Sequence, residues 1–132
     1  MCDPDAPAAK PFAYALLRVV PRVDRGERVN VGVALYCRQH DFLDLRTHVD
    51  ERRLNALAPD LDPTAVRAQL DAIAHVVCGD PQGGALAQLP PSDRFGWLVA
   101  PASTSIQPSE VHTGLTSDPP ATLEHLFTSL VV

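Results

Sequence analysis

A chain of 132 residues, with 45% hydrophobic and 20% charged residues, has the length and composition of one soluble globular domain. Its formal net charge of -5 opposes binding to polyanions and argues against non-specific nucleic-acid binding, which depends on neutralised phosphates. No apolar stretch approaches the roughly 18 residues of a membrane span and the first residues lack the apolar core of a signal peptide, so the cytoplasm is the expected location.

The N-terminal part predicts a short tail followed by three antiparallel strands. Residues 1–11 contain three prolines and no hydrophobic period, which indicates a flexible tail in front of a single domain over residues 12–132. Three runs rich in β-branched and aromatic residues follow, with a charged loop after the first and a polar turn after the second. Their expected ranges are Ala13–Val20, Val29–Cys37 and Phe42–Val49.

The register of these strands follows from their alternation, because a slip of one residue moves every side chain to the other face. A period of two kept throughout places Leu17 and Val19 on the same face as the alternate residues from Val29 to Cys37. The opposite face then carries polar side chains. On that face Arg18, Gly32 and His48 should form one row across the sheet, with the glycine leaving a gap between two long side chains.

The rest of the chain predicts helices and one or two short strands. Asp62 and Pro63 are typical of a helix start, apolar residues recur from Val66 to Val77, and Gly79 is the expected end. The other expected elements are a short helix over Asp50–Leu57, a turn at Ala85–Leu89, a helix or turn over Asp93–Ala100, strands at Ser103–Gln107 and Val111–Leu115 separated by Pro108, and a final helix after Asp118. The predicted class is α+β: an antiparallel sheet, built from a three-stranded meander and one or two short C-terminal strands, with helices packed mainly on one face.

Two stretches carry a resemblance to a known family. They read YALLRVVPRVDRGERVNVGVALYC, over residues 14–37, and DRFGWLVAPASTSIQPSEVHTGLTSDP, over residues 93–119. With them the chain resembles, over Phe12–Val131, the bacterial family DUF3037, a domain of unknown function. The resemblance implies a small cytoplasmic protein without an established activity and carries over no catalytic residue. Through the family's association with kinases resembling the HipA toxin, it also implies a protein partner.

Two groups of charged residues could bind an anion. The loop Arg22–Arg28 contains Arg25 and Glu27, and its guanidinium groups could clamp phosphate or carboxylate; alternatively, its charges neutralise one another in solvent. The polar sheet face contains the second group, which could bind an anion and move a proton, although antiparallel sheets often expose a polar face to water. This group is Arg18, Asn30, Arg46 and His48.

The segment Ser103–Gly114 adds Gln107 and His112 to the candidate ligand-binding residues. A Ser–His nucleophile pair is conceivable there, but the nucleophile-elbow spacing is missing, and serines in proline-broken loops usually satisfy backbone groups. Neither the five histidines nor the three cysteines have the spacing of metal ligands, and Cys37 and Cys78 are expected to be small buried side chains. No glycine-rich phosphate loop is present, so the sequence predicts no cofactor and no metal, and it assigns no catalytic residue.

Two functions of different classes are consistent with these features. The preferred one is a non-catalytic accessory domain that binds a protein, because from Leu54 onward the chain has two basic and eight acidic residues and offers a charged surface. The other is a small sensor or enzyme for an anionic metabolite, using Arg18, Asn30, Arg46 and His48. A concave pocket that gathers these four side chains would favour the sensor. Contact between the end of the sheet near Arg25 and the Gln107–His112 segment would favour a shared role for the two motifs.

Overall fold

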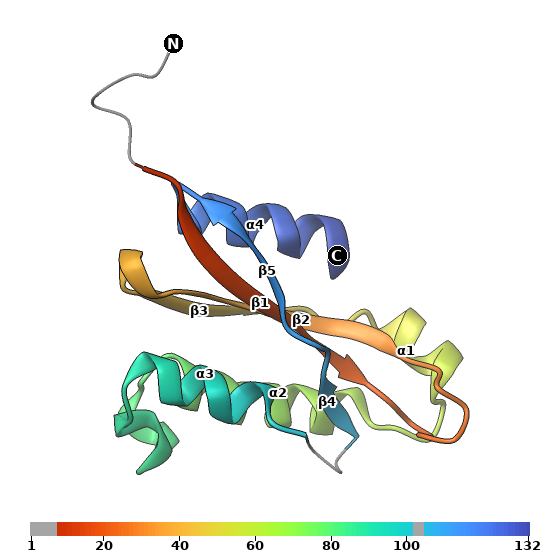
Figure 1. Ribbon diagram of the computed structural model, residues 1–132. Coiled ribbons are helices and arrows are strands. Elements are labelled where there is room, and N and C mark those ends of the chain that lie inside the picture. Colours follow the sequence, from red (N-terminus) through yellow and green to blue (C-terminus); the bar gives the residue numbers. More distant parts are fainter. Residues whose placement is uncertain (1–7, 102–104) are drawn as a thin grey trace.

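The computed structural model describes residues 8–101 and 105–132, and within them the chain folds into one antiparallel sheet covered by helices on both faces (Figure 1). The strands are β1 (Lys10–Val19), β2 (Val29–Cys37), β3 (Phe42–Thr47), β4 (Ile106–Pro108) and β5 (His112–Thr116). The α-helices are α1 (Glu51–Leu57), α2 (Pro63–Val77), α3 (Pro91–Val99) and α4 (Pro119–Leu130), with 3-10 turns η1 (Arg38–His40), η2 (Pro81–Gly83) and η3 (Leu86–Gln88). The predicted α+β class is confirmed.

The sheet is open and has the strand order β3-β2-β1-β4, so β3 is one edge strand. Both short C-terminal strands pair with the free side of β1: β5 with its first half and β4 with its last three residues. β1 begins at Lys10, earlier than predicted, because β5 pairs with it there through Thr116. Residues 1–7 of the expected tail, and residues 103 and 104 of an expected strand, lie outside the described residues. Pro108 was expected to separate two strands; it instead ends β4, at the sheet edge, where a residue without an N–H group is tolerated.

The helix ends follow the capping residues read from the sequence. Asp62 Oδ1 accepts a hydrogen bond from the Thr64 N–H at 2.9 Å and begins α2, and Asp118 caps α4 in the same way through the Ala121 N–H at 3.2 Å. Gly79 has a φ of 72° just after α2, the left-handed conformation that favours glycine at a helix end. The helix predictions at residues 62–79 and 118–131 are therefore confirmed.

The predicted register of β2 is wrong for the residues that follow Val31. Leu17 pairs with Gly32, but its neighbour Arg18 pairs with Asn30, so Val31 is an extra residue that forms a β-bulge. The bulge reverses the alternation of β2: Val31 belongs to one core and Val33 to the core on the opposite face. The row of Arg18, Gly32 and His48 does not form.

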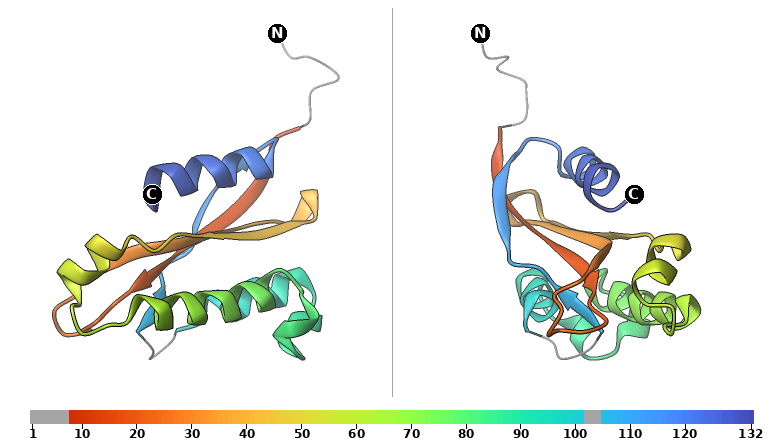
Figure 2. Two further views of the ribbon diagram at one scale, coloured as in Figure 1. Left: turned by 180° about the vertical axis from the view of Figure 1, so that it is seen from behind. Right: turned by 90° about the vertical axis from the view of Figure 1, so that its right-hand side faces the viewer.

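Each face of the sheet has its own hydrophobic core. The α2/α3 face packs against α1, α2 and α3, and the α4 face packs against α4, on opposite sides of the strands (Figures 1 and 2). The α2/α3 core contains Leu17, Val19, Val31, Ala34, Leu45, Leu54, Val66, Leu70, Val77, Phe95, Leu98 and Ile106. The α4 core contains Leu16, Val33, Leu35, Cys37, Leu123 and Val131. Three of the four helices lie on one face as expected, and α4 covers the face that was expected to be polar.

The free edge of β3 contains a hydrogen bond between a side chain and the backbone. Asp44 Oδ1 accepts from the N–H of the next residue, Leu45, at 2.8 Å. This backbone donor is therefore not left open at the edge of the sheet.

Ser109 joins the end of β4 to the middle of β1. The Leu16 N–H donates to the buried Ser109 Oγ at 2.8 Å, and the Ser109 N–H donates to the Leu16 carbonyl at 2.8 Å. We expect Ser109→Ala to lower the free energy of unfolding by about 1–3 kcal/mol, because the buried Leu16 N–H loses its acceptor. Urea denaturation would measure this. Ser129→Ala, on an exposed turn of α4, is the matched control and should change stability by less than about 0.5 kcal/mol; equal effects of the two changes would contradict the prediction.

Candidate functional site

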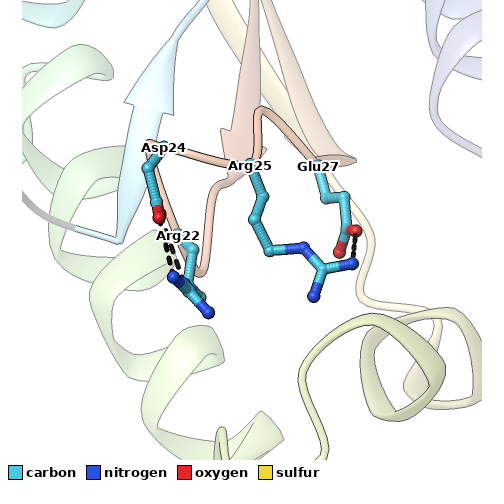
Figure 3. Close-up of polar contacts among 4 residues, drawn as sticks. All are labelled: Arg22, Asp24, Arg25 and Glu27. Atoms are coloured by element: carbon cyan, nitrogen blue, oxygen red, sulfur yellow. Dashed lines mark hydrogen bonds and ion pairs between the residues drawn. The ribbon is translucent and has the colours of Figure 1, made fainter.

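The charges of the β1–β2 loop are paired within the loop. Arg22 Nη2 lies 2.7 Å from Asp24 Oδ2, and Arg25 forms an ion pair with Glu27 (Figure 3). All four side chains are exposed or half-exposed, and such pairs contribute little to stability. This arrangement matches the alternative of mutual neutralisation; anion binding by Arg25 and Glu27 stays a prediction.

Two of the predicted sheet-face residues hold α4 against the sheet. Arg46 forms an ion pair with Glu124, and its guanidinium group lies 4.8 Å from the centre of the Phe127 ring. Asn30 Nδ2 donates to the Leu130 carbonyl at 2.9 Å, near the end of the helix. These side chains therefore have a structural role that depends on α4 and was not predicted from the sequence.

His48 lies just beyond β3 and is exposed. Its backbone N–H donates to the Val31 carbonyl at 2.9 Å. The pKa of the Asp50 carboxyl is lowered mainly by a backbone hydrogen bond from Arg53, and the nearby His48 adds to this effect. The four residues of the predicted polar face thus do not share one pocket among the described residues. Arg46 and Asn30 contact α4, whereas Arg18 contacts the β4–β5 connection.

Arg18 is the centre of a separate cluster at the β1 edge. It pairs across the strands with Asn30 on one side and Gln107 on the other. Its side chain is 12% exposed, and its Nη1 lies 4.0 Å from Glu110 Oε2. Its Nε is buried and has no hydrogen-bond partner in the part of the chain that the structure describes. Burial, followed by repulsion from Arg28, lowers the pKa of Arg18, while Glu110 opposes this change.

Glu110 and His112 complete this cluster. The two family motifs, residues 14–37 and 93–119, meet here because β1 of the first pairs with β4 and β5 of the second. Glu110 Oε1 lies 3.4 Å from His112 Nε2, and the His112 ring lies 5.1 Å from the ring of Tyr14. A backbone hydrogen bond and the nearby Arg18 lower the pKa of Glu110, so its carboxylate is charged at neutral pH. Arg25 itself is paired with Glu27 and not with this cluster.

An apolar groove lies on the α2/α3 face of the sheet, on the opposite face to the Arg18 side chain. It has a volume of about 450 Å³ and runs between α2, α3 and the edge of the sheet. Leu17, Ile73, Leu98 and Ile106 contribute buried or half-buried side chains to its lining, and Trp97, which is 36% exposed, contributes an aromatic one. This groove was not predicted from the sequence. The one available signal was the chain's single tryptophan within the second family motif.

Of the candidate nucleophiles, Ser109 contacts the main chain and Cys78 lies 3.7 Å from the Asp44 carboxylate. The Ser109 hydroxyl donates to the Glu110 carbonyl and accepts from the backbone of Leu16, so it is engaged with the main chain as the alternative predicted. Cys37 is buried as expected, but Cys78 is exposed, and partial desolvation together with Asp44 raises the pKa of its thiol. Among the described residues, no group of three metal-ligating side chains lies close enough to hold a metal ion. No helix in the described part is long and apolar enough to cross a membrane.

The fold and the groove define an α+β protein whose open antiparallel sheet is covered on both faces and presents an apolar groove at one edge. A family model described as "Protein of unknown function (DUF3037)" matches residues 14–131, nearly the whole chain, and the chain belongs to this family. No curated protein and no solved structure matches it.

Proposed function

We propose that the protein is a non-catalytic, cytoplasmic binding module that takes an apolar segment of a partner protein into the groove between α2, α3 and β4. The groove carries the proposal, because a concave apolar surface with an exposed aromatic side chain is the usual form of a binding site. Its α2 wall is formed by Gln69, Ala72 and Ile73, which are uncharged, so apolar contact rather than charge would supply most of the affinity.

The pairing of the other candidate residues supports a module of this kind over the metabolite sensor. Arg25, Asn30 and Arg46 already have partners within the chain, and these partners lie in the loop or on α4. A sensor would need several of these groups to converge on one ligand. The sensor remains a prediction for Arg18, and its site would be the cluster with Glu110 and not the whole sheet face.

Trp97→Ala tests the proposal. A random dodecapeptide library displayed on phage is selected on the native protein, and the recovered peptides are measured by fluorescence anisotropy. We expect Trp97→Ala to weaken binding by at least about 30-fold, because a central tryptophan typically contributes 2 kcal/mol or more to an interface.

Leu89→Ala is the matched control, because Leu89 is exposed to a similar extent but does not line the groove. It should leave peptide affinity unchanged, and circular dichroism should show both variants folded. Failure to recover any peptide that depends on Trp97 would overturn the proposal.

The family resemblance suggests a kinase resembling the HipA toxin as the natural partner, and we propose it as the first candidate. Co-expression of both proteins followed by size-exclusion chromatography would test it. The complex should form with the native chain and be lost with Trp97→Ala.

A further inference from the structure

The groove continues into a second hollow that ends at a charged side chain. The two share Pro101 and Pro108, and the second, of about 290 Å³, is also lined by Gln107, Ser109 and Glu110. The Glu110 side chain is 70% exposed. Arg18 lies between Leu17 and Val19 in β1 and therefore projects from the opposite face of the sheet to the groove. A peptide segment that passes from the groove around the edge strand β4 would reach Glu110 and, beyond it, Arg18.

Arg18 is a buried cation with incomplete compensation. Its distance of 4.0 Å to Glu110 is too long for a hydrogen bond, and its Nε has no hydrogen-bond partner among residues 8–101 and 105–132. A largely buried guanidinium group normally has a hydrogen-bonded carboxylate, since removing the charge from water is costly. Glu110 is too exposed to be held firmly in this role.

The charges around Arg18 leave an excess of positive charge. Arg18 and Arg28 both act on Glu110, and within the described part of the chain Glu110 is the acidic group that acts on Arg18. Arg22 and Arg25 of the nearby loop form ion pairs with Asp24 and Glu27, so these two acids do not compensate Arg18. His112, at 3.4 Å from Glu110, adds a further positive charge when it is protonated. The missing group is therefore an anion.

We propose that the partner segment carries an Asp or Glu side chain beside its apolar anchor, and that this carboxylate binds Arg18 in place of Glu110. The inference rests on the proposed function, because the apolar anchor has to occupy the groove. In the free protein Glu110 holds the position of the ligand carboxylate and turns outward when the partner binds. Its exposed side chain can make this movement without disturbing either core.

Glu110→Gln tests the proposal because it removes the competing charge and keeps the side-chain size. The probes are acidic dodecapeptides selected from the phage library and the same peptides with Asp or Glu replaced by Asn or Gln. Glu110→Gln should tighten binding of the acidic peptides about two- to fivefold, the effect of losing one exposed competing ion pair. It should leave the neutral peptides unchanged. Arg18→Lys, which keeps the charge but loses the planar guanidinium, should weaken only the acidic peptides.

The outcomes separate the two proposals. Peptides that depend on Trp97 but lack an acidic residue, or that bind less tightly to Glu110→Gln, would overturn the carboxylate inference and leave the proposed function standing. Selected peptides that carry Lys or Arg, instead of Asp or Glu, beside the apolar anchor would also overturn the carboxylate inference and leave the proposed function standing. If no peptide depends on Trp97, both fall.

Discussion

Leu35→Ala is expected to lower the free energy of unfolding by about 3 kcal/mol, within the range of about 2–5 kcal/mol for leucine truncation in a packed core. Leu35 is fully buried in β2, on the α4 face of the sheet, where it belongs to the same core as Leu123 and Val131. The removed methyl groups leave a cavity that a strand between two packed layers cannot close. Chemical denaturation monitored by circular dichroism would measure the change.

Leu115→Ala is the matched control, because Leu115 is 70% exposed on β5 and the substitution is the same. Its effect should be within about 0.5 kcal/mol. A double-mutant cycle provides a second check on the position of Leu35. Leu35→Ala should couple to Leu123→Ala, which shares its core, and should add independently to Leu70→Ala, which lies on the other face. Coupling to Leu70 instead would contradict the bulged register.

Ending the chain at Asp118, which removes α4, should abolish cooperative unfolding. The α4 core would then expose Leu16, Val33 and Leu35 to water. Each buried side chain of this size contributes about 1.5–3 kcal/mol, so the loss is comparable to the whole stability of a small domain. The shortened chain should bind the dye ANS and lose its near-ultraviolet circular dichroism.

Removing Val132 alone is the control for the shortened chain, because this residue is 57% exposed whereas its neighbour Val131 is buried. The control should keep a cooperative thermal transition. A native-like transition in the chain that lacks α4 would show that the helix is dispensable, contrary to the expectation.

The sequence predicted the elements of the fold better than their faces. α2 and α4 were predictable because Asp62 and Asp118 cap them and their apolar residues recur with helical spacing. The register failed at Val31, because a bulge breaks the period of two without leaving a separate mark in the composition of β2. The run VGVAL at residues 31–35, which is buried throughout, is instead typical of a strand buried on both faces.

The candidate site was predictable only in part, for a related reason. Arg18, Gln107 and His112 were identified as polar residues in suggestive segments, and the structure places them near one another through β1, β4 and β5. The contacts of Asn30 and Arg46 depend on α4, which is about 80 to 100 residues away in sequence. Such pairings follow from tertiary packing and not from local spacing. The apolar groove also depends on tertiary packing, since its lining comes from β1, α2, α3 and β4.

The hydrogen bond between Asp44 and the Leu45 N–H has a consequence for self-association. An uncovered outer strand offers a ladder of donors and acceptors on which a second chain can add, and this is a common first step towards fibrils. At the outer edge of β3 one rung of that ladder is occupied from within the chain, and the occupying group carries a negative charge that an incoming strand would have to desolvate. A protein with a largely apolar β2 next to this edge strand can thereby keep its sheet from growing by addition of further copies.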